Sequence, residues 1–411
     1  MNFVFVSVGI GSRAAGGDVI AIEVARRLAR AGHGLSVLTS EEGREIWQAA
    51  GVAAEYWVFD RQRWRVPSTG SGRGAGELVG GSLALTRRLL KATAFALRRR
   101  ADASVVIAAS DMLQDVVAGA ALRGRGSRRL AIFHMVNPSP FRGYAHAFDG
   151  AAPPALDLRA GLNFLQQRLA LLCLRRCYDV VITQTPANRR FLEAHLKPSQ
   201  VLPRDLPYGV DFGEDAGSEL EEEPAFDACW LGRYHPQKGL DDLLRVWQLV
   251  VRERPWARLA LIGDVAEAMA PRIEAMGLAE NVACLGYLSG AAKLRALRQS
   301  RLFLFPSRFE GKPVAMAEAL ACGLPVVAYD LPVYEGAFAG GLVRCAIGDV
   351  AEMAGQVLRL LDDGEALRAL SRAAREAVAG QTWEASAQLV LEAATAAMGS
   401  APTKSGEAVA A

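Results

Sequence analysis

Short apolar runs alternate with amphipathic segments along most of the chain. The runs resemble strands that are buried on both faces of a parallel sheet, and the segments between them carry apolar residues at helical spacing. Runs of this kind occur at Asn2–Val8, Leu35–Thr39, Ser104–Ala109, Leu130–Phe133, Asp179–Thr183, Phe226–Leu231, Arg258–Ile262, Asn281–Leu285, Leu302–Phe305 and Leu324–Ala328. The alternation predicts an α/β fold with parallel sheets.

The length of 411 residues predicts two domains. An acidic stretch that contains Gly and Ser divides the chain, so we assign residues 1–210 to a first domain, 211–225 to a linker and 226–380 to a second domain. Residues 399–411 form a small polar tail that we expect to be disordered. With 51% hydrophobic residues and a mean hydropathy of +0.13, the chain has enough apolar material for two cores.

The six cysteines include no C-x-x-C pair, which favours free thiols in a reducing compartment. Cys173 and Cys177 lie one helical turn apart, and a metal pair is the alternative for them. No stretch reaches the roughly 18 apolar residues of a spanning helix. Met1–Gly11 lacks a charged start and runs into a glycine loop, which predicts a first strand rather than a signal peptide. These features predict a cytoplasmic protein.

Charge is unevenly distributed between the two halves. Residues 1–211 carry 28 Lys and Arg against 17 Asp and Glu, and residues 212–411 carry 19 against 27. The basic first half predicts an anionic partner. We expect residues 60–82 to be irregular and Leu83–Arg100 to form a helix. Its apolar face would hold Leu85, Leu89, Leu90, Ala94 and Leu97, and its basic face Arg87, Arg88, Lys91, Arg98, Arg99 and Arg100. This helix is either an ordinary surface helix or one that lies on an anionic membrane.

Two stretches of the second domain suggest phosphate and sugar binding. Gly232, Arg233, Lys238 and Gly239 lie between a strand and a helix, an arrangement that can grip a diphosphate, although a simple basic turn would look similar.

The second stretch, residues 306–328, reads as strand end, loop, helix and strand. The amides after Gly311 would lie at a helix start, with Pro313 suited to the first helical position. Glu310 and Glu318 would then flank an anion site, where sugar hydroxyls are natural partners. The alternative is that both glutamates are solvated.

In the first domain, Gly9-x-Gly11-x-x-Ala14 is a weak dinucleotide fingerprint without a well-placed ribose acid. The alternative is that Gly16 and Gly17 let the backbone approach a ligand between the domains. His134 follows a predicted strand at the edge where α/β sheets bind ligands, and it is either structural or chemical.

These stretches resemble the motifs of the retaining GT-B glycosyltransferases of family 4, the glycosyl transferases group 1 type. Glu310 and Glu318 match the two glutamates of the E-x7-E signature, but the usual E-G-F-G is E-G-K-P here, so Lys312 and Pro313 depart from it. Leu206-Pro-Tyr-Gly-Val-Asp211 resembles I-P-N-G-V-D, with Tyr208 in place of Asn. Thr382-Trp383-Glu384 resembles the closing motif, which implies that a last helix, about residues 383–398, packs back on the first domain.

The resemblance implies a GT-B fold, with two Rossmann-like domains around a cleft, and roles for individual residues. Arg233 and Lys238 would hold the donor diphosphate without a metal or other cofactor, Glu310 would orient the donor sugar, Glu318 would hold the ribose, and His134 would contact a donor or acceptor hydroxyl. The predicted catalytic residues are Glu310, Arg233, Lys238 and His134. The predicted donor-binding residues are Gly16, Gly17, Gly232, Gly286, Tyr287, Gly311, Lys312, Pro313, Val314 and Glu318.

The implied reaction moves a sugar from a UDP- or GDP-sugar to an acceptor hydroxyl, with retention. The acceptor would be a lipid-linked saccharide or a growing glycan, as in polysaccharide biosynthesis. Peripheral contact of the basic domain with the inner face of an anionic membrane is a separate hypothesis, and we expect no nucleic-acid partner. The alternatives are a GT-B-like sugar-nucleotide epimerase and a NAD-dependent oxidoreductase.

Overall fold

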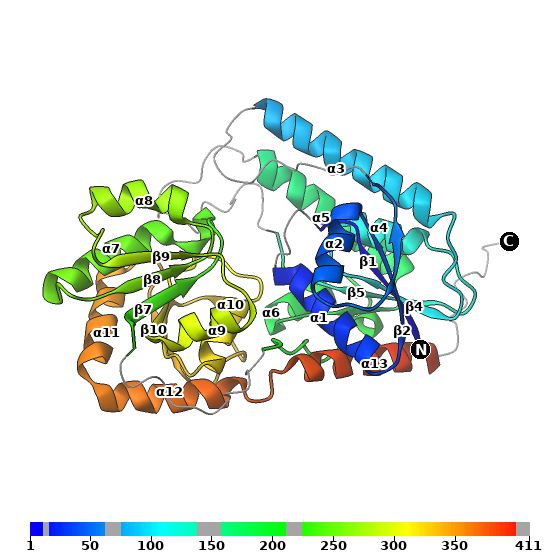
Figure 1. The fold of residues 1–411 in the computed structure, drawn as a ribbon. Coiled ribbons are helices and arrows are strands. Elements are labelled where there is room, and N and C mark those ends of the chain that lie inside the picture. Colours follow the sequence, from blue (N-terminus) through cyan, green and yellow to red (C-terminus); the bar gives the residue numbers. More distant parts are fainter. Residues whose placement is uncertain (11–15, 62–74, 138–157, 211–223, 400–411) are drawn as a thin grey trace.

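The computed structural model describes residues 1–10, 16–61, 75–137, 158–210 and 224–399. These residues form two lobes, each built on one parallel sheet (Figure 1). The predicted linker and tail lie almost wholly outside the described residues, and so does most of the predicted irregular segment before the basic helix.

The first sheet has six parallel strands in the order β3-β2-β1-β4-β5-β6. Parallel strands buried on both faces need helical crossovers, which explains the alternating pattern. The strands are β1 Asn2–Ser7, β2 Gly34–Thr39, β3 Glu55–Val58, β4 Ser104–Ala108, β5 Arg128–Ile132 and β6 Val180–Ile182. The helices are α1 Gly16–Arg30, α2 Glu41–Ala49, α3 Ala75–Ala96, α4 Leu113–Ala121, α5 Leu158–Cys177 and α6 Pro186–Glu193, followed by the 3-10 turn η2 Pro198–Gln200.

The second sheet also has six parallel strands, in the order β12-β11-β10-β7-β8-β9, which is the same topology counted from β7. Its strands are β7 Phe226–Leu231, β8 Leu259–Ile262, β9 Val282–Gly286, β10 Ser300–Phe305, β11 Val326–Tyr329 and β12 Leu342–Cys345. Its helices are α7 Leu240–Glu253, α8 Ala266–Ala275, α9 Gly290–Arg298, α10 Val314–Ala321, α11 Val350–Asp362 and α12 Gly364–Val378, with the 3-10 turns η3 Pro236–Lys238 and η4 Pro332–Tyr334. In each sheet the strand order reverses beside the first strand, where α/β sheets bind ligands. The predicted α/β, GT-B type of fold is confirmed.

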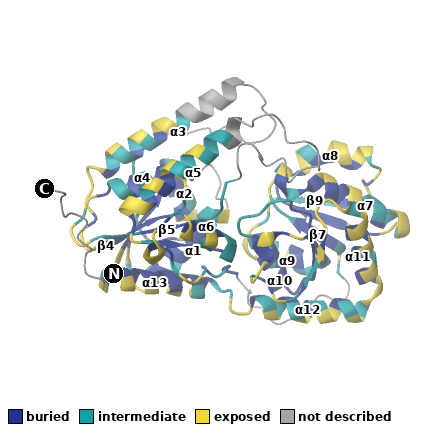
Figure 2. Cartoon of the chain, turned by 180° about the vertical axis from the view of Figure 1, so that it is seen from behind, coloured by how far each residue is buried: buried dark blue, intermediate teal, exposed yellow. Residues whose placement is uncertain are grey.

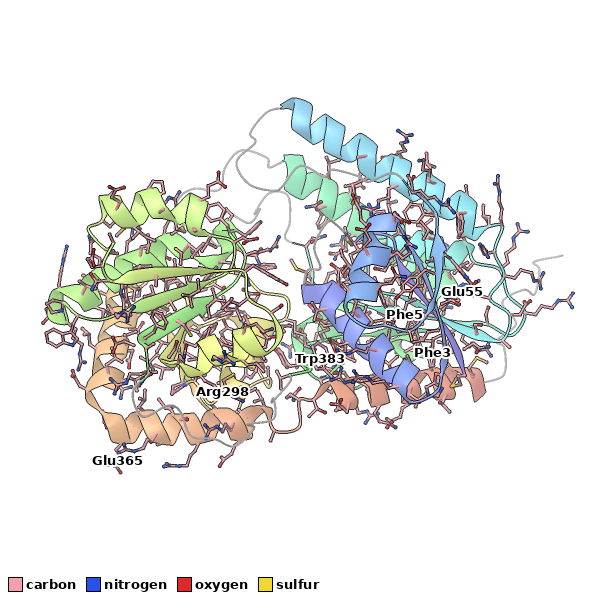
Figure 3. All side chains as sticks on the ribbon, in the orientation of Figure 1. Phe3, Phe5, Glu55, Arg298, Glu365 and Trp383 are labelled. Carbon is pink, nitrogen blue, oxygen red and sulfur yellow. The ribbon has the colours of Figure 1, made fainter. Side chains whose placement is uncertain are left out.

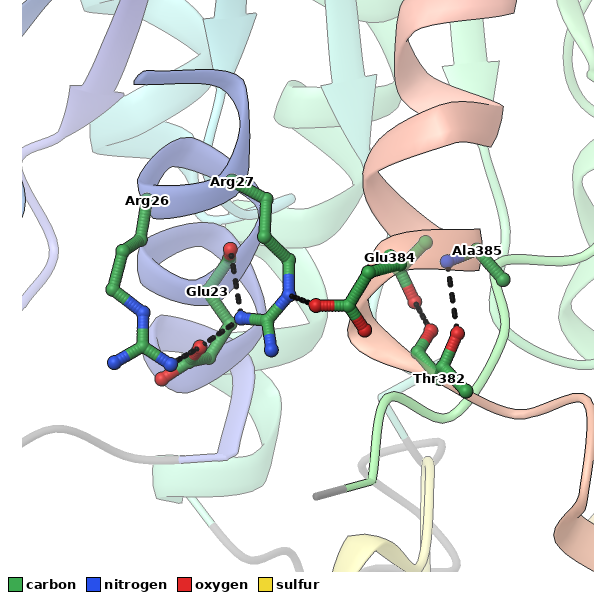
Figure 4. Close-up of polar contacts among 7 residues, drawn as sticks. Glu23, Arg26, Arg27, Thr382, Glu384 and Ala385 are labelled. Carbon is green, nitrogen blue, oxygen red and sulfur yellow. Dashed lines mark hydrogen bonds and ion pairs between the residues drawn. The ribbon is translucent and has the colours of Figure 1, made fainter. Parts of the chain in front are cut away.

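The last helix, α13 Trp383–Gly399, returns to the first domain and packs against α1 (Figure 1). Thr382 caps it, with Oγ1 accepting a hydrogen bond from the Ala385 amide at 3.1 Å. Arg27 of α1 donates to Glu384 at 2.6 Å (Figure 4). Trp383 is buried at the start of this helix, between the two lobes (Figure 3). The apolar side of α13 is therefore part of the first domain's core.

The structure corrects the prediction for the basic helix. α3 begins at Ala75, so the residues from there to 82 are helical rather than irregular. Arg88, Ala92 and Ala96 are buried, while Leu90 and Leu97 are 64% and 46% exposed, so the predicted division into faces is wrong. The small alanines let α3 approach its neighbours closely. Arg88 is buried because it donates to the carbonyl oxygen of Ile10 and to Ser40 Oγ, each at 2.8 Å.

Candidate active site

The loop after β7 forms a compact turn at the carboxyl end of the second sheet. His235 caps η3, with its ring accepting from the Gln237 amide, and Gly239 then starts α7 with a φ of 65°. A Cβ atom at Gly239 would overlap the carbonyl oxygen of Pro306, which follows β10. Only glycine allows both this backbone conformation and this approach. The loops after β7 and β10 are therefore in contact.

Lys238 and Glu310 form an ion pair across these two loops. Lys238 Nζ lies 2.6 Å from Glu310 Oε1, and their side chains are only 13% and 6% exposed. Lys238 Nζ also lies 5.4 Å from the centroid of the Phe305 ring. A shielded cation beside a carboxylate is a suitable place for a diphosphate that is linked to a polyhydroxylated sugar. The two predicted motifs thus meet in one small site.

A buried network holds this pair of loops in place. Arg308 donates to Asp242 Oδ2 through Nε and one terminal nitrogen, at 3.0 and 2.6 Å, and the Tyr329 hydroxyl donates to the same oxygen at 3.0 Å. The Arg308 amide donates to the carbonyl oxygen of Gln237 at 2.8 Å. These residues were missed from sequence. The available signal was Asp242, an acid in the first turn of α7 that lies on the buried side of this amphipathic helix.

Three glycine turns line the carboxyl ends of β7, β8 and β9. The Gly232 amide donates to the carbonyl oxygen of Ile262 at 3.0 Å, and the Gly263 amide donates to that of Gly286 at 2.7 Å. Tyr287, just after this row, is 69% exposed. Arg233 is exposed, and within the described residues it has no ion pair or hydrogen bond partner. Its guanidinium can therefore swing toward an anion near Gly232.

Glu318 lies on α10 and pairs with Lys293 of α9. Lys293 Nζ lies 2.6 Å from Glu318 Oε1, and the side chains are 23% and 18% exposed. This pairing satisfies the half-buried carboxylate and leaves it further acceptor capacity for hydroxyls. Lys293 was not identified from sequence, because nothing in the pattern links α9 to α10.

The start of α10 differs slightly from the prediction. Pro313 is the residue that precedes the helix, and Val314 is its first residue. The Nζ of Lys312 donates to the carbonyl oxygens of Leu206 and Pro207 in the first domain. Burial lowers the pKa of Lys312 to about 7, and the nearby Asp205 acts in the opposite direction. In this structure its ammonium serves an interdomain contact, and its predicted part in donor binding stays a prediction.

His134 lies after β5, held by its backbone and both ring nitrogens. Its amide donates to Asp111 Oδ1 at 2.9 Å. Nε2 lies 2.9 Å from the carbonyl oxygen of Ala109, and Nδ1 lies against the amide nitrogen of Gln184. A carbonyl must receive a proton and an amide NH₂ must donate one, so this geometry fits a neutral ring protonated on Nε2. A Cβ atom at Gly17 would lie 2.9 Å from Nε2, whereas one at Gly16 would meet nothing.

The two domains touch where these loops face each other. A Cβ atom at Gly311 would lie 2.6 Å from Met135 Cβ and 3.1 Å from the carbonyl oxygen of His134. The structure therefore brings together Gly17, His134, Gly311, Glu310 and Lys238. The group formed by Glu318 and Lys293 lies further along α10, and Tyr287 and Gly286 lie at the end of β9.

Asp115 is a buried acid that contacts the start of the predicted dinucleotide fingerprint at Gly9. Asp115 Oδ1 accepts from the amides of Val8 and Gly9 at 2.7 and 2.8 Å. Burial raises the pKa of Asp115 to about 7, while hydrogen bonds from Ser110, Gly9 and Val8 act against this rise. These two amides are thus occupied and do not offer donors to a pyrophosphate. The rest of that loop, including Gly11 and Ala14, lies outside the described residues.

Metal chemistry has no obvious ligand set in the described part of the chain. There, no three residues among His, Cys, Asp and Glu gather as metal ligands. Burial raises the pKa of Cys173 to about 12, with a smaller effect of Cys177, so its thiolate, the form that binds metals, is disfavoured. Among the helices that the structure describes, none combines the length and apolarity needed to span a bilayer.

The fold belongs to the GT-B class, with two Rossmann-like domains that are each built on one six-stranded parallel sheet. Structurally, the chain is similar to TarM, with a TM-score of 0.69 and 13% sequence identity over 97% of this chain and 99% of that one. Residues 225–363 match the family described as "Glycosyl transferases group 1". This match confirms the predicted resemblance to the group 1 glycosyltransferases, and it lies in the second domain.

Curated relatives agree with this assignment. The D-inositol 3-phosphate glycosyltransferase of Segniliparus rotundus is 30% identical over 210 residues, which cover 47% of this chain and 46% of the relative. The phosphatidyl-myo-inositol mannosyltransferase of Mycobacterium leprae is 30% identical over 194 residues, covering 46% and 52%. The chain thus spans about half the length of the curated relatives it matches.

Proposed function

We propose that the protein transfers a sugar from a nucleoside diphosphate sugar to an acceptor hydroxyl, with retention of the anomeric configuration. The observation that carries the proposal is the Lys238–Glu310 pair. This pair links Lys238, in a turn suited to bind phosphate, to Glu310, a carboxylate suited to bind sugar hydroxyls. The same loop touches the first domain at Met135, where an acceptor would approach.

This reaction requires stabilisation of the negative charge that develops on the leaving group. The bond between the anomeric carbon and the diphosphate oxygen breaks, and a bond to the acceptor oxygen forms on the same face of the sugar. The diphosphate then gains negative charge, which Lys238 and the exposed Arg233 would stabilise without a metal. In the family that this chain resembles, the departing phosphate can take the proton of the acceptor hydroxyl. No protein nucleophile is assigned.

The carboxylates would select and orient the donor. Glu310 is held beside Lys238, so its second oxygen can accept hydrogen bonds from hydroxyls of the transferred sugar. Glu318, neutralised by Lys293, can accept from the ribose hydroxyls. The base would lie near Gly286 and the exposed Tyr287. UDP or GDP as the nucleotide is part of this proposal.

The first test is thermal stabilisation by UDP, GDP, dTDP, ADP and NAD, each with and without excess chelator. A ligand at 100 times its Kd adds about 2.7 kcal/mol to the free energy of unfolding, which shifts Tm by several degrees. We expect a shift with one nucleoside diphosphate, UDP or GDP, that persists in chelator. Loss of the shift in chelator and its recovery with Mg²⁺ or Mn²⁺ would contradict the metal-independent site.

The same panel separates the alternatives. A shift with NAD alone would support the oxidoreductase and overturn our proposal. Sugar-nucleotide turnover in the absence of any acceptor, with an isomerised sugar nucleotide as the product, would support the epimerase.

We also propose a lipid-linked acceptor and peripheral docking on an anionic, cytoplasmic membrane face. The Mycobacterium leprae relative is named for mannosyl transfer to phosphatidyl-myo-inositol. In this chain, α3 and α5 both pack on α4. Figure 2 shows exposed residues along both α3 and α5. Leu165, Leu169 and Leu172 of α5 are spaced to share one face of the helix, and they are 45–56% exposed. Arg98, Arg175 and Arg176 are exposed nearby in sequence. Leucines beside cations suit an anionic interface.

Replacing Leu165, Leu169 and Leu172 together by Ser should lower binding to anionic vesicles by about tenfold or more, because three apolar side chains can no longer enter the interface. Co-sedimentation at low salt measures the bound fraction. Trp256→Ser is the matched control, since this residue is 73% exposed on the other domain. Equal loss in both variants, or no binding by the unaltered protein, would refute the docking proposal.

A further inference from the structure

Lys312, in the loop between β10 and α10, reaches out of its own domain. Its Nζ donates to the carbonyl oxygens of Leu206 and Pro207 at 2.9 and 2.6 Å. It also lies 4.8 Å from the centroid of the Tyr208 ring. Two carbonyls and an aromatic face suit an ammonium group, which has only donors. Residues 206–208, here called the hinge segment, therefore form a receptor for this one side chain.

The hinge segment is itself fixed at the point where the chain passes between the domains. The Leu206 amide donates to the carbonyl oxygen of Thr183, after β6, at 2.7 Å. The Tyr208 amide donates to Gln381 Oε1 at 2.9 Å, and Ser386 Oγ donates to the carbonyl oxygen of Pro207 at 3.1 Å. Lys312 thus attaches to a segment that both the first domain and the returning helix α13 hold rigid.

Residues 310–313 are here called the donor loop. Three consecutive residues of this loop each contact a different partner. Glu310 pairs with Lys238, Gly311 abuts Met135, and Lys312 binds the hinge segment. A movement of the first domain relative to this loop would therefore pull on Lys312 and shift the neighbouring Glu310. The contact of Lys312 therefore couples the position of the first domain to the position of Glu310 in the second domain.

The buried, charged side chain of Lys312 needs hydrogen-bond acceptors, which this contact supplies. Burial lowers its pKa to about 7, and the carboxylate of Asp205 opposes that shift. Burial raises the pKa of the Tyr208 hydroxyl, and the charges of Asp205 and Glu310 add to that rise. A buried ammonium is costly when its donors lack acceptors. The side chain should thus leave the carbonyls only when the domains separate and water replaces them.

We propose that Lys312 is a positioning residue that fastens the donor loop to the hinge segment and so sets Glu310 relative to the acceptor side at His134. The proposal rests on the transferase function proposed above. Lys312 and Tyr208 are also two positions at which this chain departs from the motifs it resembles. The structure places these two side chains in contact, so the two departures from the motifs belong to one interaction.

The test is Lys312→Met, which keeps the length of the side chain but removes its donors. We expect kcat to fall by about 10²-fold, as for a small misplacement of reacting groups. The KM for the donor and the thermal shift with the nucleoside diphosphate should stay within about threefold and a degree or two of the unaltered protein. Small-angle scattering should show a larger radius of gyration, and Lys312→Arg should recover part of kcat. Lys197→Met, at an exposed lysine, is the control.

A double-mutant cycle with Tyr208→Leu tests the proposed interaction. The double variant should lose little more activity than either single variant, because the two side chains act through one contact. Independent, multiplying losses would overturn this coupling. Loss of nucleotide binding in Lys312→Met would show instead that the residue contacts the donor, and an unchanged kcat would also overturn the proposal.

The scattering result keeps the two proposals apart. If no nucleotide binds even to the unaltered protein, the proposed function fails. The radius of gyration of Lys312→Met still reports whether Lys312 holds the domains together. An unchanged radius in this variant would overturn the positioning role.

Discussion

Lys238→Ala should lower kcat/KM for sugar transfer by about 10²–10³-fold and abolish the thermal shift with the nucleoside diphosphate. The reason is that a preorganised cation beside the leaving group stabilises charge that develops only in the transition state, and loss of one such group costs this much in other enzymes. Steady-state kinetics with a saturating acceptor, together with the thermal shift, measure the effect.

The design must separate chemistry from stability. Lys238→Ala removes the cation that pairs with the buried Glu310. Removing one partner of a buried pair costs about 3–5 kcal/mol of stability. The double variant Lys238→Ala/Glu310→Gln removes that isolated charge. We expect it to recover Tm but not activity. Lys197→Ala should match the unaltered protein. Unchanged kinetics in Lys238→Ala would refute the assignment of Lys238 to the diphosphate.

Gly263→Ala should destabilise the C-terminal domain by about 3 kcal/mol and lower its Tm by about 10 °C. Gly263 has a φ of 140°, a conformation that other residues rarely adopt, and a Cβ atom there would overlap the carbonyl oxygen of Gly232. Because both groups belong to the backbone, no side chain can move to relieve the overlap. The turn at Gly232 would shift, and nucleotide binding should weaken as well.

Gly277→Ala is the matched control for this prediction. Gly277 also has a positive φ, 69°, but a Cβ atom there meets nothing within 4 Å. The Gly277→Ala substitution should therefore lower the free energy of unfolding by only about 1 kcal/mol, the cost of the left-handed backbone conformation for alanine. Calorimetry of both variants compares the two costs. Equal destabilisation would mean that the contact between the turns after β7 and β8 does not constrain the site.

The sequence by itself determined the fold class and predicted the kind of site. Buried parallel strands must be continuously apolar and must alternate with helices, so most strands were visible in the sequence. The motifs around Lys238, Glu310 and Glu318 gave the class of chemistry through their resemblance to a known family. Short or weakly apolar elements escaped, namely α2, β3, α4, α8 and β12, because a brief periodic signal is ambiguous.

Only the tertiary structure decided which charged residues pair and which way they point. Arg88 was expected on a solvated face of its helix, but it is buried because Ile10 and Ser40 supply acceptors from distant segments. Lys293 meets Glu318, and Arg308 meets Asp242, across loops that no local pattern connects.

Lys312 shows the same limit most clearly. Its partners, the carbonyl oxygens of Leu206 and Pro207 in the first domain, could not be deduced from its sequence position beside Glu310. The apolar pattern of a chain reflects burial, which is averaged over whole elements. The partner of a single long side chain depends on atoms brought together from several elements, and that information exists only once the domains have packed.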